Sequence, residues 1–563
     1  MRNESVSAAF REIALLLELK GESSFQARAY RRAADGIDRA EDLADLAREG
    51  RLTDLPGVGK GLADKIAYFF ATGSIPMLAD LRREVPPGMV ELTGIPGLGA
   101  GRARALREEI GVSSPEELEK AVADGRIAQV KGFGPKRIED LTRALADWRR
   151  FRDFRLYHDA AKEAARIGEI LRGRGASRTA PAGEVGLYRE IAGVIRVVAA
   201  MSPEAALHAL AIEADTALEG DRVLFRSAAG LPGEARAVAP ERFGAVLVWE
   251  TGADAHRTAL VAAARERGFL FDPKGLSRNG TPVETPDEET FFSLLGLPFL
   301  PPEIRERADV VEDAAAGRFP RLVVREDLKG ALHVHSDWSD GTASIRAMAE
   351  RAAEMGYAYL ALSDHSRSAG YAGGLSAERL LEQAEEVDRV NTLLAPFRVF
   401  RGIESDILAD GRLDYDDGAL ARLDFVVASV HSRFGLDREE QTERILRAIL
   451  HPQTTWLGHS SGRLLLEREA YDFDAERVWR AAGEARKGVE LNGHPSRLDV
   501  DWRVIPGLRA LGVPVPIAVD AHDPEGLAVP EIAIRIARKG GLRPEEVPNT
   551  LGVEAFAEWI ARR

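Results

Sequence analysis

The chain has 563 residues, and its balance of 45% hydrophobic and 29% charged residues is typical of a soluble globular protein. Its length predicts about three to five domains, because a single hydrophobic core stops growing at roughly 250–300 residues. The absence of cysteine excludes disulfides, thiolate metal ligands and cysteine nucleophiles, and the formal net charge of −14 argues against a surface coated in basic residues. The N-terminus lacks the apolar core of a signal peptide, and no apolar run approaches the length of a membrane span, so a cytoplasmic protein without membrane contact is expected.

Two amphipathic helices are predicted near the N-terminus, at residues 10–19 and 25–34, and a glycine motif then occurs three times. Each copy places two glycines two residues apart in a turn that leads into a helix with Lys or Arg near its start. Glycine lets a ligand approach the backbone closely, and a helix N-terminus attracts phosphate. The motif residues expected to contact DNA are Gly57, Gly59, Lys60, Gly97, Gly99, Arg102, Gly132, Gly134 and Lys136.

Three copies with adjacent basic residues indicate helix-hairpin-helix elements, which bind DNA backbones without reading bases and could hold a monovalent cation at the turn. The alternative for each copy is a helix-connecting turn without a ligand. Here the chain resembles the bacterial family X DNA polymerases: residues 1–85 resemble their eight-kilodalton domain and 86–150 their fingers. By this resemblance Lys65 falls where the related DNA polymerase beta uses a lysine to form a Schiff base with an abasic sugar.

The resemblance continues through an α+β palm at 151–240, with strands at 192–200 and 223–225, and a thumb at 241–312. The stretches 239–245 and 251–256 resemble the passage from palm to thumb, and the stretches 268–276 and 295–303 resemble the thumb itself. A linker is expected at 313–327.

The catalytic carboxylates of the palm are the point at which this chain departs from the family. Nucleotidyl transfer needs two metal ions held by closely placed carboxylates, yet Val194 and Arg196 fall where the family has an Asp-x-Asp pair. Glu184 replaces a serine of the triphosphate-binding turn. The nearest candidate for the third catalytic acid is Glu234. Valine cannot bind a metal and arginine repels one. We therefore predict a degenerate, weak or inactive polymerase site, with neither Mg²⁺ or Mn²⁺ nor deoxynucleotides expected there, and a palm kept as a DNA-docking frame.

From residue 328 to 563, apolar strands alternate with amphipathic helices, which indicates an α/β barrel. Seven of its eight histidines lie where a predicted strand ends, and the carboxyl ends of barrel strands converge on one face. His333 and His335, two residues apart, are expected to point to the same side of their strand. One such histidine would more often be a satisfied polar residue, but the series indicates a metal site.

This region resembles the PHP (polymerase and histidinol phosphatase) domain, whose family fold is a distorted seven-stranded barrel with three divalent metal ions. The resemblance implies one ion on His333, His335, Glu404 and Asp520, a second on Asp340, His365 and His522, and a third on Glu404, His431 and His459. Mn²⁺ and Zn²⁺ are the expected metals. Asp364 is expected to orient His365, and Arg463 and Arg497 to meet a phosphate. His494 stands where the family has asparagine.

The sequence thus predicts a multidomain, monomeric DNA-repair protein with a metal-dependent 3′–5′ exonuclease in the PHP domain. Two alternatives remain open at this stage. One is a bifunctional gap-filling polymerase and exonuclease that uses unrecognised palm acids. The other is a DNA end-binding scaffold that does not synthesise DNA, whose barrel cleaves slowly or acts on a small phosphate ester.

Overall fold

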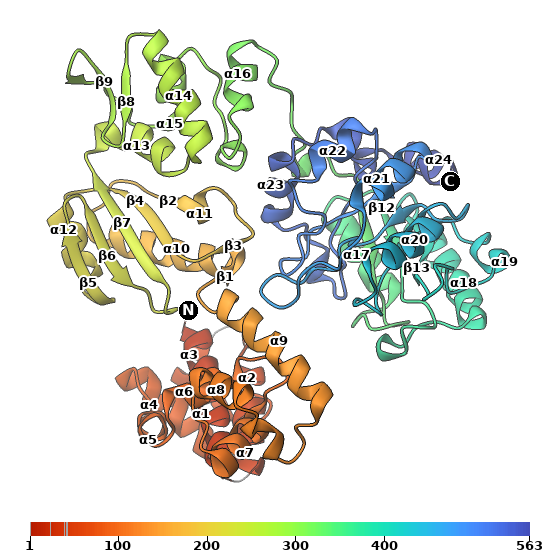
Figure 1. Cartoon of the computed structure of the whole chain (residues 1–563), viewed down its shortest axis with the longest axis horizontal. Helices are drawn as coiled ribbons and strands as arrows, with labels where there is room; N and C mark the ends of the chain where they lie inside the picture. The colour runs from red at the N-terminus through yellow and green to blue at the C-terminus, as the bar shows by residue number, and fades with distance from the viewer. Residues whose placement is uncertain (1, 23, 39, 41–42, 563) are drawn as a thin grey trace. The chain divides into compact units, whose positions relative to one another are not determined.

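The computed structural model describes residues 2–22, 24–38, 40 and 43–562, which divide into two compact units at 152/153. Each unit is considered separately (Figure 1). Among the described residues, no helix combines the length and apolarity needed to cross a membrane.

The first unit is entirely helical, and one hydrophobic core runs from Val6 to Leu145 through both predicted N-terminal regions. The predicted helices at 10–19 and 25–34 are confirmed as parts of longer ones, whose aromatic rings Phe10 and Tyr30 meet edge to face at 5.2 Å between centroids. The helices are α1 (Arg2–Lys20), α2 (Ser24–Asp38), α3 (Leu43–Arg48), α4 (Lys60–Thr72), α5 (Pro76–Glu84), α6 (Pro87–Thr93), α7 (Ala100–Ile110), α8 (Pro115–Ala123) and α9 (Pro135–Phe151).

The second unit begins with a five-stranded mixed sheet in the order β2-β4-β7-β6-β5, which confirms the predicted α+β palm. Alternation along β4 sends Ile195, Val197 and Ala199 to the face covered by α10 and α12, and Val198 and Ala200 to the face covered by α13. The elements are β1 (Arg155–Leu156), α10 (Tyr157–Gly173), β2 (Thr179–Ala182), α11 (Gly183–Gly186), β3 (Ile191–Ala192), β4 (Ile195–Ala200), α12 (Pro203–Leu210), β5 (Ala214–Glu219), β6 (Arg222–Arg226) and β7 (Pro232–Val238).

The thumb follows the palm, and its helices pack around a small antiparallel sheet with Phe271, Phe291 and Phe292 in its core. Its elements are α13 (Phe243–Glu250), α14 (Asp254–Glu266), β8 (Leu270–Asp272), β9 (Gly275–Arg278), β10 (Thr281–Pro282), α15 (Glu288–Leu294) and α16 (Asp309–Ala315).

A buried histidine in the thumb predicts that this protein loses stability in mild acid. His256 on α14 is fully buried, with its Nδ1 3.0 Å from the Arg307 carbonyl oxygen. Burial lowers the pKa of His256 to about 4 from 6.5. As the pH falls through this window, the unfolded chain takes up a proton that the folded chain excludes, so folding stability falls by roughly 3 kcal/mol. His256→Asn is expected to flatten the pH dependence of the urea midpoint between pH 6.5 and 4; an unchanged slope would assign the acid sensitivity to other groups.

The C-terminal region is a parallel barrel, as predicted. Six strands follow chain order from β11 to β16, and β17 pairs with β18. The ring closes at Val334, which bridges to Ala521, and the Ala521 N–H donates to the His333 carbonyl over 3.1 Å. The strands are β11 (Gly330–Val334), β12 (Tyr359–Leu362), β13 (Arg398–Asp406), β14 (Phe425–Ser429), β15 (Trp456–Leu457), β16 (Gly488–Val489), β17 (Leu491–Asn492) and β18 (Ile517–Ala518).

Helices surround this barrel, and large side chains fill its interior below the strand ends. Phe400, Phe425 and Trp456 are fully buried there, and Phe556 of the last helix packs against them. The barrel is therefore a packed core whose open end alone is available for chemistry. The helices are α17 (Ile345–Glu354), α18 (Ala377–Leu394), α19 (Asp417–Leu420), α20 (Arg438–Ile449), α21 (Ala475–Glu484), α22 (Ile505–Ala510), α23 (Glu531–Lys539) and α24 (Val553–Ala561).

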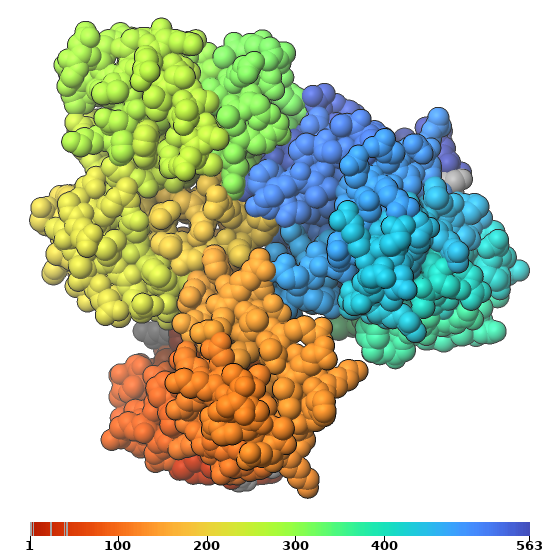
Figure 2. All heavy atoms as spheres, viewed as in Figure 1, coloured from red at the N-terminus to blue at the C-terminus, as the bar shows by residue number. Residues whose placement is uncertain are grey.

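Within the second unit, ion pairs join the thumb and palm to helix α23 of the barrel. Glu303 is fully buried and pairs with Arg535 at 3.1 Å and Arg538 at 2.5 Å. Lys539, also buried, donates to Glu306 over 2.7 Å and to the Leu187 carbonyl over 3.0 Å. In Figure 2 the green thumb surface and the dark blue surface of the C-terminal region touch.

Candidate metal centre

The residues predicted as metal ligands converge at the open end of the barrel. All nine belong to four overlapping groups in which the ligand atoms lie within 4.8 Å of one another. The groups are His335, Asp340, His365 and His522; His333, Glu404 and His459; His333, His335 and Asp520; and His365, Glu404 and His431.

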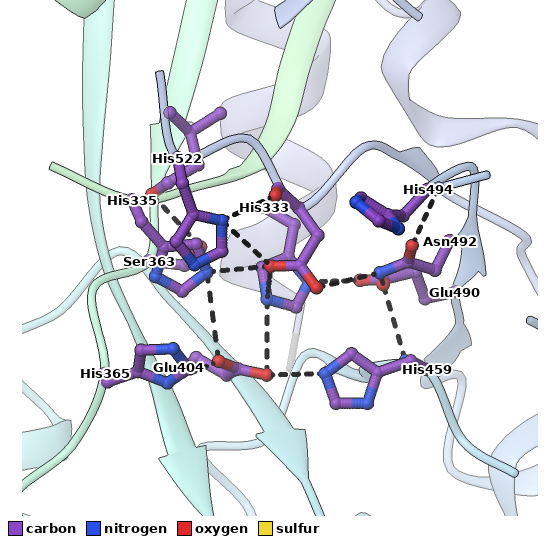
Figure 3. Close-up of polar contacts among 12 residues, drawn as sticks. His333, His335, Ser363, His365, Glu404, His459, Glu490, Asn492, His494 and His522 are labelled. Atoms are coloured by element: carbon purple, nitrogen blue, oxygen red, sulfur yellow. Dashed lines mark hydrogen bonds and ion pairs between the residues drawn. The ribbon is translucent and has the colours of Figure 1, made fainter. Parts of the chain in front are cut away.

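Glu404 lies at the centre of this cluster, and the rings of His333, His335, His365 and His459 surround its carboxylate (Figure 3). Its Oε1 is 2.9 Å from His459 Nε2 and 3.2 Å from His431 Nε2, and its Oε2 is 2.8 Å from His365 Nδ1. The sequence predicted Glu404 at a strand end, whereas β13 continues to Asp406. A carboxylate held inside a strand and reached from both oxygens is suited to bridge two cations.

His333 and His335 reach the site through a break in strand geometry that the sequence did not predict. The register of β11 shifts between Ala331 and Val334, and His333 has φ +56°, a left-handed conformation that is rare for residues other than glycine. Both rings then face Asp520, whose Oδ1 is 3.8 Å from His333 Nε2 and 3.1 Å from His335 Nε2. Asp520 (φ +55°) is strained in the same way, which is common where function dictates backbone shape.

A second cluster of contacts surrounds Asp340, on the loop after β11. Its Oδ1 is 3.3 Å from His522 Nε2 and its Oδ2 is 3.6 Å from His365 Nε2. The ring of His335 stacks on that of His522 at 4.3 Å. These four residues enclose a volume that one cation could fill.

The imidazoles and carboxylates of the cluster shift one another's pKa values. Burial alone would lower the pKa of His333 and of His431, but nearby carboxylates, Glu404 among them, raise both, that of His431 to about 10. Burial alone would raise the pKa of Glu404 and of Asp520, yet the neighbouring imidazoles hold both well below their ordinary values.

Several buried atoms of the site make no regular hydrogen bond among the described residues, namely His333 Nε2, both ring nitrogens of His335, His365 Nδ1 and Glu404 Oε2. The close polar neighbours that they have, such as His365 Nδ1 and Glu404 Oε2 at 2.8 Å, are other ligand atoms of the cluster. Buried polar atoms are rarely left unsatisfied. Divalent cations bound to these nitrogen and oxygen donors would satisfy them, so the residues present fit metal ions.

Two buried acids that the sequence reasoning missed hold the ligand histidines in place. Glu490 accepts from His333 Nδ1 at 2.7 Å, and Asp406 from His431 Nδ1 at 2.6 Å. Such carboxylates fix the tautomer and raise the basicity of a metal-bound imidazole. The signal for Glu490 was a carboxylate inside the apolar run Gly488–Leu491.

The contact of Glu490 predicts a large effect on metal affinity. Glu490→Gln should weaken Mn²⁺ binding about 10- to 100-fold, because the amide cannot accept from His333 Nδ1 as strongly as the carboxylate does. Calorimetric titration of the metal-free protein measures this change. Glu558→Gln, whose side chain is 72% exposed, is the matched control. Equal affinities for wild type and Glu490→Gln would refute the orienting role.

Two of the other predicted residues differ from expectation. Asp364 was expected to orient His365, but it accepts hydrogen bonds from Ser336, Ser339 and Gln383. It therefore fixes the loop between His335 and Asp340.

Arg463 was predicted to bind phosphate. Its guanidinium instead donates to the Arg497 and Leu498 carbonyls and to Asp501. This arrangement makes it an anchor of the 497–501 segment.

Arg497 and His494 lie beside the cluster. Arg497 Nε is 3.6 Å from Asp520 Oδ2, with a side chain 21% exposed, so its guanidinium borders the site; its contact with a phosphate stays a prediction. His494 is exposed and its Nδ1 is 2.8 Å from Ser496 Oγ. It belongs to none of the four groups.

In the palm, an ion-pair network occupies the position predicted for the catalytic acids. β4 and β7 run parallel with Arg196 opposite Glu234, and the Glu234 carboxylate lies between the guanidinium groups of Arg196 and Arg222. Glu184 Oε2 accepts from the backbone N–H groups of Gly193 and Val194 at 2.8 and 3.3 Å. The carboxylates of Glu184 and Glu234 are thus both bound to groups of this chain.

The palm cleft beside this network has a volume of about 300 Å³ and a lining of mixed charge. Arg189, Arg196 and Arg257 line it, and each is paired with a carboxylate of this chain.

The three glycine turns share one geometry. Gly57, Gly97 and Gly132 have φ between +82° and +92°, and helices α4, α7 and α9 each begin after the second glycine. Apart from the adjacent backbone, no atom of the described residues lies within 4 Å of a Cβ built on Gly59, Gly99 or Gly134, so these turns are open to a ligand. Lys65 is partly exposed and donates to the Gly61 carbonyl; its lyase role stays a prediction.

The fold and the site define a class of multidomain protein in which helix-hairpin-helix elements, palm and thumb precede a PHP-type barrel with a candidate metal site. Family models match in that order: a helix-hairpin-helix domain at 1–75, a SAM-like helix-hairpin-helix tandem at 89–147, a DNA polymerase beta thumb at 245–306 and a PHP domain at 331–494. The chain is 32% identical to the DNA polymerase/3′-5′ exonuclease PolX of Bacillus subtilis, with 99% of each chain covered. It therefore belongs to the bacterial family X DNA polymerases with a C-terminal PHP domain.

Smaller relatives match part of the chain. A probable phosphatase of Syntrophotalea carbinolica is 28% identical over 39% of this chain and 90% of its own length. A probable phosphatase of a Thermoanaerobacter species is 28% identical over 27% of this chain and 64% of its own length.

Proposed function

We propose that this protein removes nucleotides from DNA 3′ ends by metal-dependent phosphodiester hydrolysis at the barrel site. The observation that carries the proposal is the nine-residue cluster with its unsatisfied buried ligand atoms. His333, His335, Glu404 and Asp520 would hold one ion, Asp340, His365 and His522 a second, and Glu404, His431 and His459 a third. Such ions would supply a hydroxide near neutral pH and stabilise the charge of the transition state.

The chain's own residues have distinct roles in this proposal. Glu404 would be shared by two ions, while Glu490 and Asp406 keep His333 and His431 oriented. Arg497, at the edge of the cluster, is placed to bind the phosphate of the substrate. Mn²⁺ is the proposed working metal, although imidazole-rich sites also suit Zn²⁺.

We further propose that the palm does not support template-directed synthesis of the usual type. The carboxylate of Glu234 is neutralised by Arg196 and Arg222, and Val194 offers no ligand. The three cleft arginines are already paired, which disfavours a triphosphate. The palm then serves as a frame, and the three glycine turns bind DNA backbones, with a monovalent cation at the turn.

A single assay tests these proposals. A labelled primer–template is incubated with the full-length protein and Mn²⁺, with and without deoxynucleotides. Shortening in both conditions is expected, and it should stop in the His333→Ala/His335→Ala variant while DNA binding persists. Extension would support a bifunctional enzyme instead.

A second candidate, suggested by the similarity to probable phosphatases, is hydrolysis of small phosphate esters. Retention of the primer without change, together with hydrolysis of p-nitrophenyl phosphate, would favour this function over the exonuclease.

A further inference from the structure

The exposed Tyr371 lies beside the candidate metal cluster and is not one of its ligands. The Tyr371 side chain is 75% exposed, the highest value among the large apolar side chains identified as exposed in the described residues. Its ring centroid is 6.2 Å from that of the candidate ligand His365, with the planes at 55°. Tyr371 is therefore next to the place where a scissile phosphate would bind, yet open to solvent.

The loop that carries Tyr371 is held rigidly from both sides. Ser366 bridges to Leu375, and the Leu375 N–H donates to the His365 carbonyl over 2.9 Å. A Cβ on Gly374 would lie 1.9 Å from the Ser366 carbonyl oxygen, so only glycine allows this close approach. Ala369 and Ala372, on either side of Gly370 and Tyr371, are buried, so the loop is packed against the barrel while the Tyr371 side chain projects outward.

A rigid, exposed aromatic ring beside a phosphodiester-cleaving centre has a chemical partner in a nucleobase. Stacking on an aromatic side chain contributes substantially to single-strand binding and tolerates every base, because every base has a π-face. Rigid presentation reduces the ordering cost of such a contact. A base can reach Tyr371 only when it is not stacked in a duplex.

We propose that Tyr371 is a stacking platform for the base of the 3′-terminal nucleotide, so that the barrel site selects unpaired DNA ends. The proposal rests on the exonuclease function proposed above. It assigns Tyr371 to substrate binding, with Arg497 holding the phosphate and the metal ligands holding the reacting atoms. Removal of the ring should therefore raise KM more than it lowers kcat.

The test pairs a change in the protein with a change in the DNA. Single-stranded oligonucleotides with either a normal or an abasic 3′-terminal nucleotide are digested by the full-length wild type, Tyr371→Ala and Tyr371→Phe in Mn²⁺. Tyr371→Ala should raise KM for the normal end about tenfold, and the abasic end should raise the wild-type KM to a similar extent. If the ring and the base interact, the abasic end should not raise the KM of Tyr371→Ala any further. Tyr371→Phe keeps the ring and should restore the dependence on the base.

Leu393→Ala, at a 57% exposed position of α18, is the matched control and should behave as wild type. The proposal would be overturned if the abasic end raised the KM of Tyr371→Ala as much as it raises that of wild type. It would also be overturned if Tyr371→Ala had the wild-type KM for the normal end.

Binding is measured separately with a 3′-terminal 2-aminopurine oligonucleotide in Ca²⁺, where stacking quenches the fluorescence. Quenching by wild type that is lost in Tyr371→Ala, with no hydrolysis in Mn²⁺, would overturn the exonuclease function but keep the stacking role. Hydrolysis with equal quenching by both proteins would overturn the stacking role alone.

Discussion

Glu404→Gln is expected to reduce the exonuclease kcat/KM about a thousandfold or more, equivalent to roughly 4 kcal/mol of transition-state stabilisation. Three imidazole nitrogens lie within 3.2 Å of the Glu404 carboxylate, and no other side chain of the cluster is reached from both oxygens at such distances. Glutamine preserves the volume but removes the charge, and it can offer only one oxygen. The cluster would then lose the carboxylate that lies between its candidate ligand histidines.

Initial rates on a labelled single strand and metal content by mass spectrometry measure this effect together. Both should fall in Glu404→Gln, while affinity for DNA in the absence of metal should persist, because the glycine turns lie in the other unit. Glu350→Gln on α17, at a side chain 42% exposed, controls for the loss of one carboxylate. A wild-type rate in Glu404→Gln would exclude the cluster as the site of hydrolysis.

Glu303→Ala is expected to lower the free energy of unfolding of the second unit by about 3–5 kcal/mol, because removing one partner leaves buried charge uncompensated. Glu303 is fully buried and is shared by Arg535 and Arg538, so alanine would leave two guanidinium groups facing a low-dielectric gap. The contact joins the thumb to helix α23. We therefore expect the thumb to unfold more readily from the barrel.

The midpoint of urea unfolding and protection of thumb amides from hydrogen exchange report the change. Glu531→Ala is a sharp control, since Glu531 pairs with the same Arg535 but its side chain is 68% exposed. An exposed pair contributes about 0–1 kcal/mol. Similar urea midpoints for the two variants would show that the buried ion pairs of Glu303 contribute no more to stability than the exposed pair of Glu531.

Much of the candidate site could be predicted because its residues follow a repeated local pattern. A short apolar strand followed by a histidine or an acid can be recognised along the chain, and a parallel barrel brings such strand ends to one face. That reasoning placed His431, His459 and His522 in the cluster. The glycine turns were equally predictable, since positive φ at Gly57, Gly97 and Gly132 is a local requirement.

Contacts between distant segments were not predictable in the same way. Glu490 supports His333 across 157 positions of sequence, and no local pattern records that pairing. Arg463 looked available for phosphate until the fold brought the 497–501 segment against its guanidinium. Asp364 precedes His365 in the chain, but its carboxylate turns to Ser336 and Gln383 instead.

The sequence by itself determined the fold class, the types of ligand and their order along the chain, because strands, helices and glycine turns depend on neighbouring residues. It also determined that the palm lacks the Asp-x-Asp pair. Only the tertiary structure decided that Glu404 lies inside a strand at the centre of the cluster, and that His333 joins it through a left-handed backbone. It likewise decided that Arg196 neutralises Glu234, because the register of β4 against β7 sets which side chains face each other.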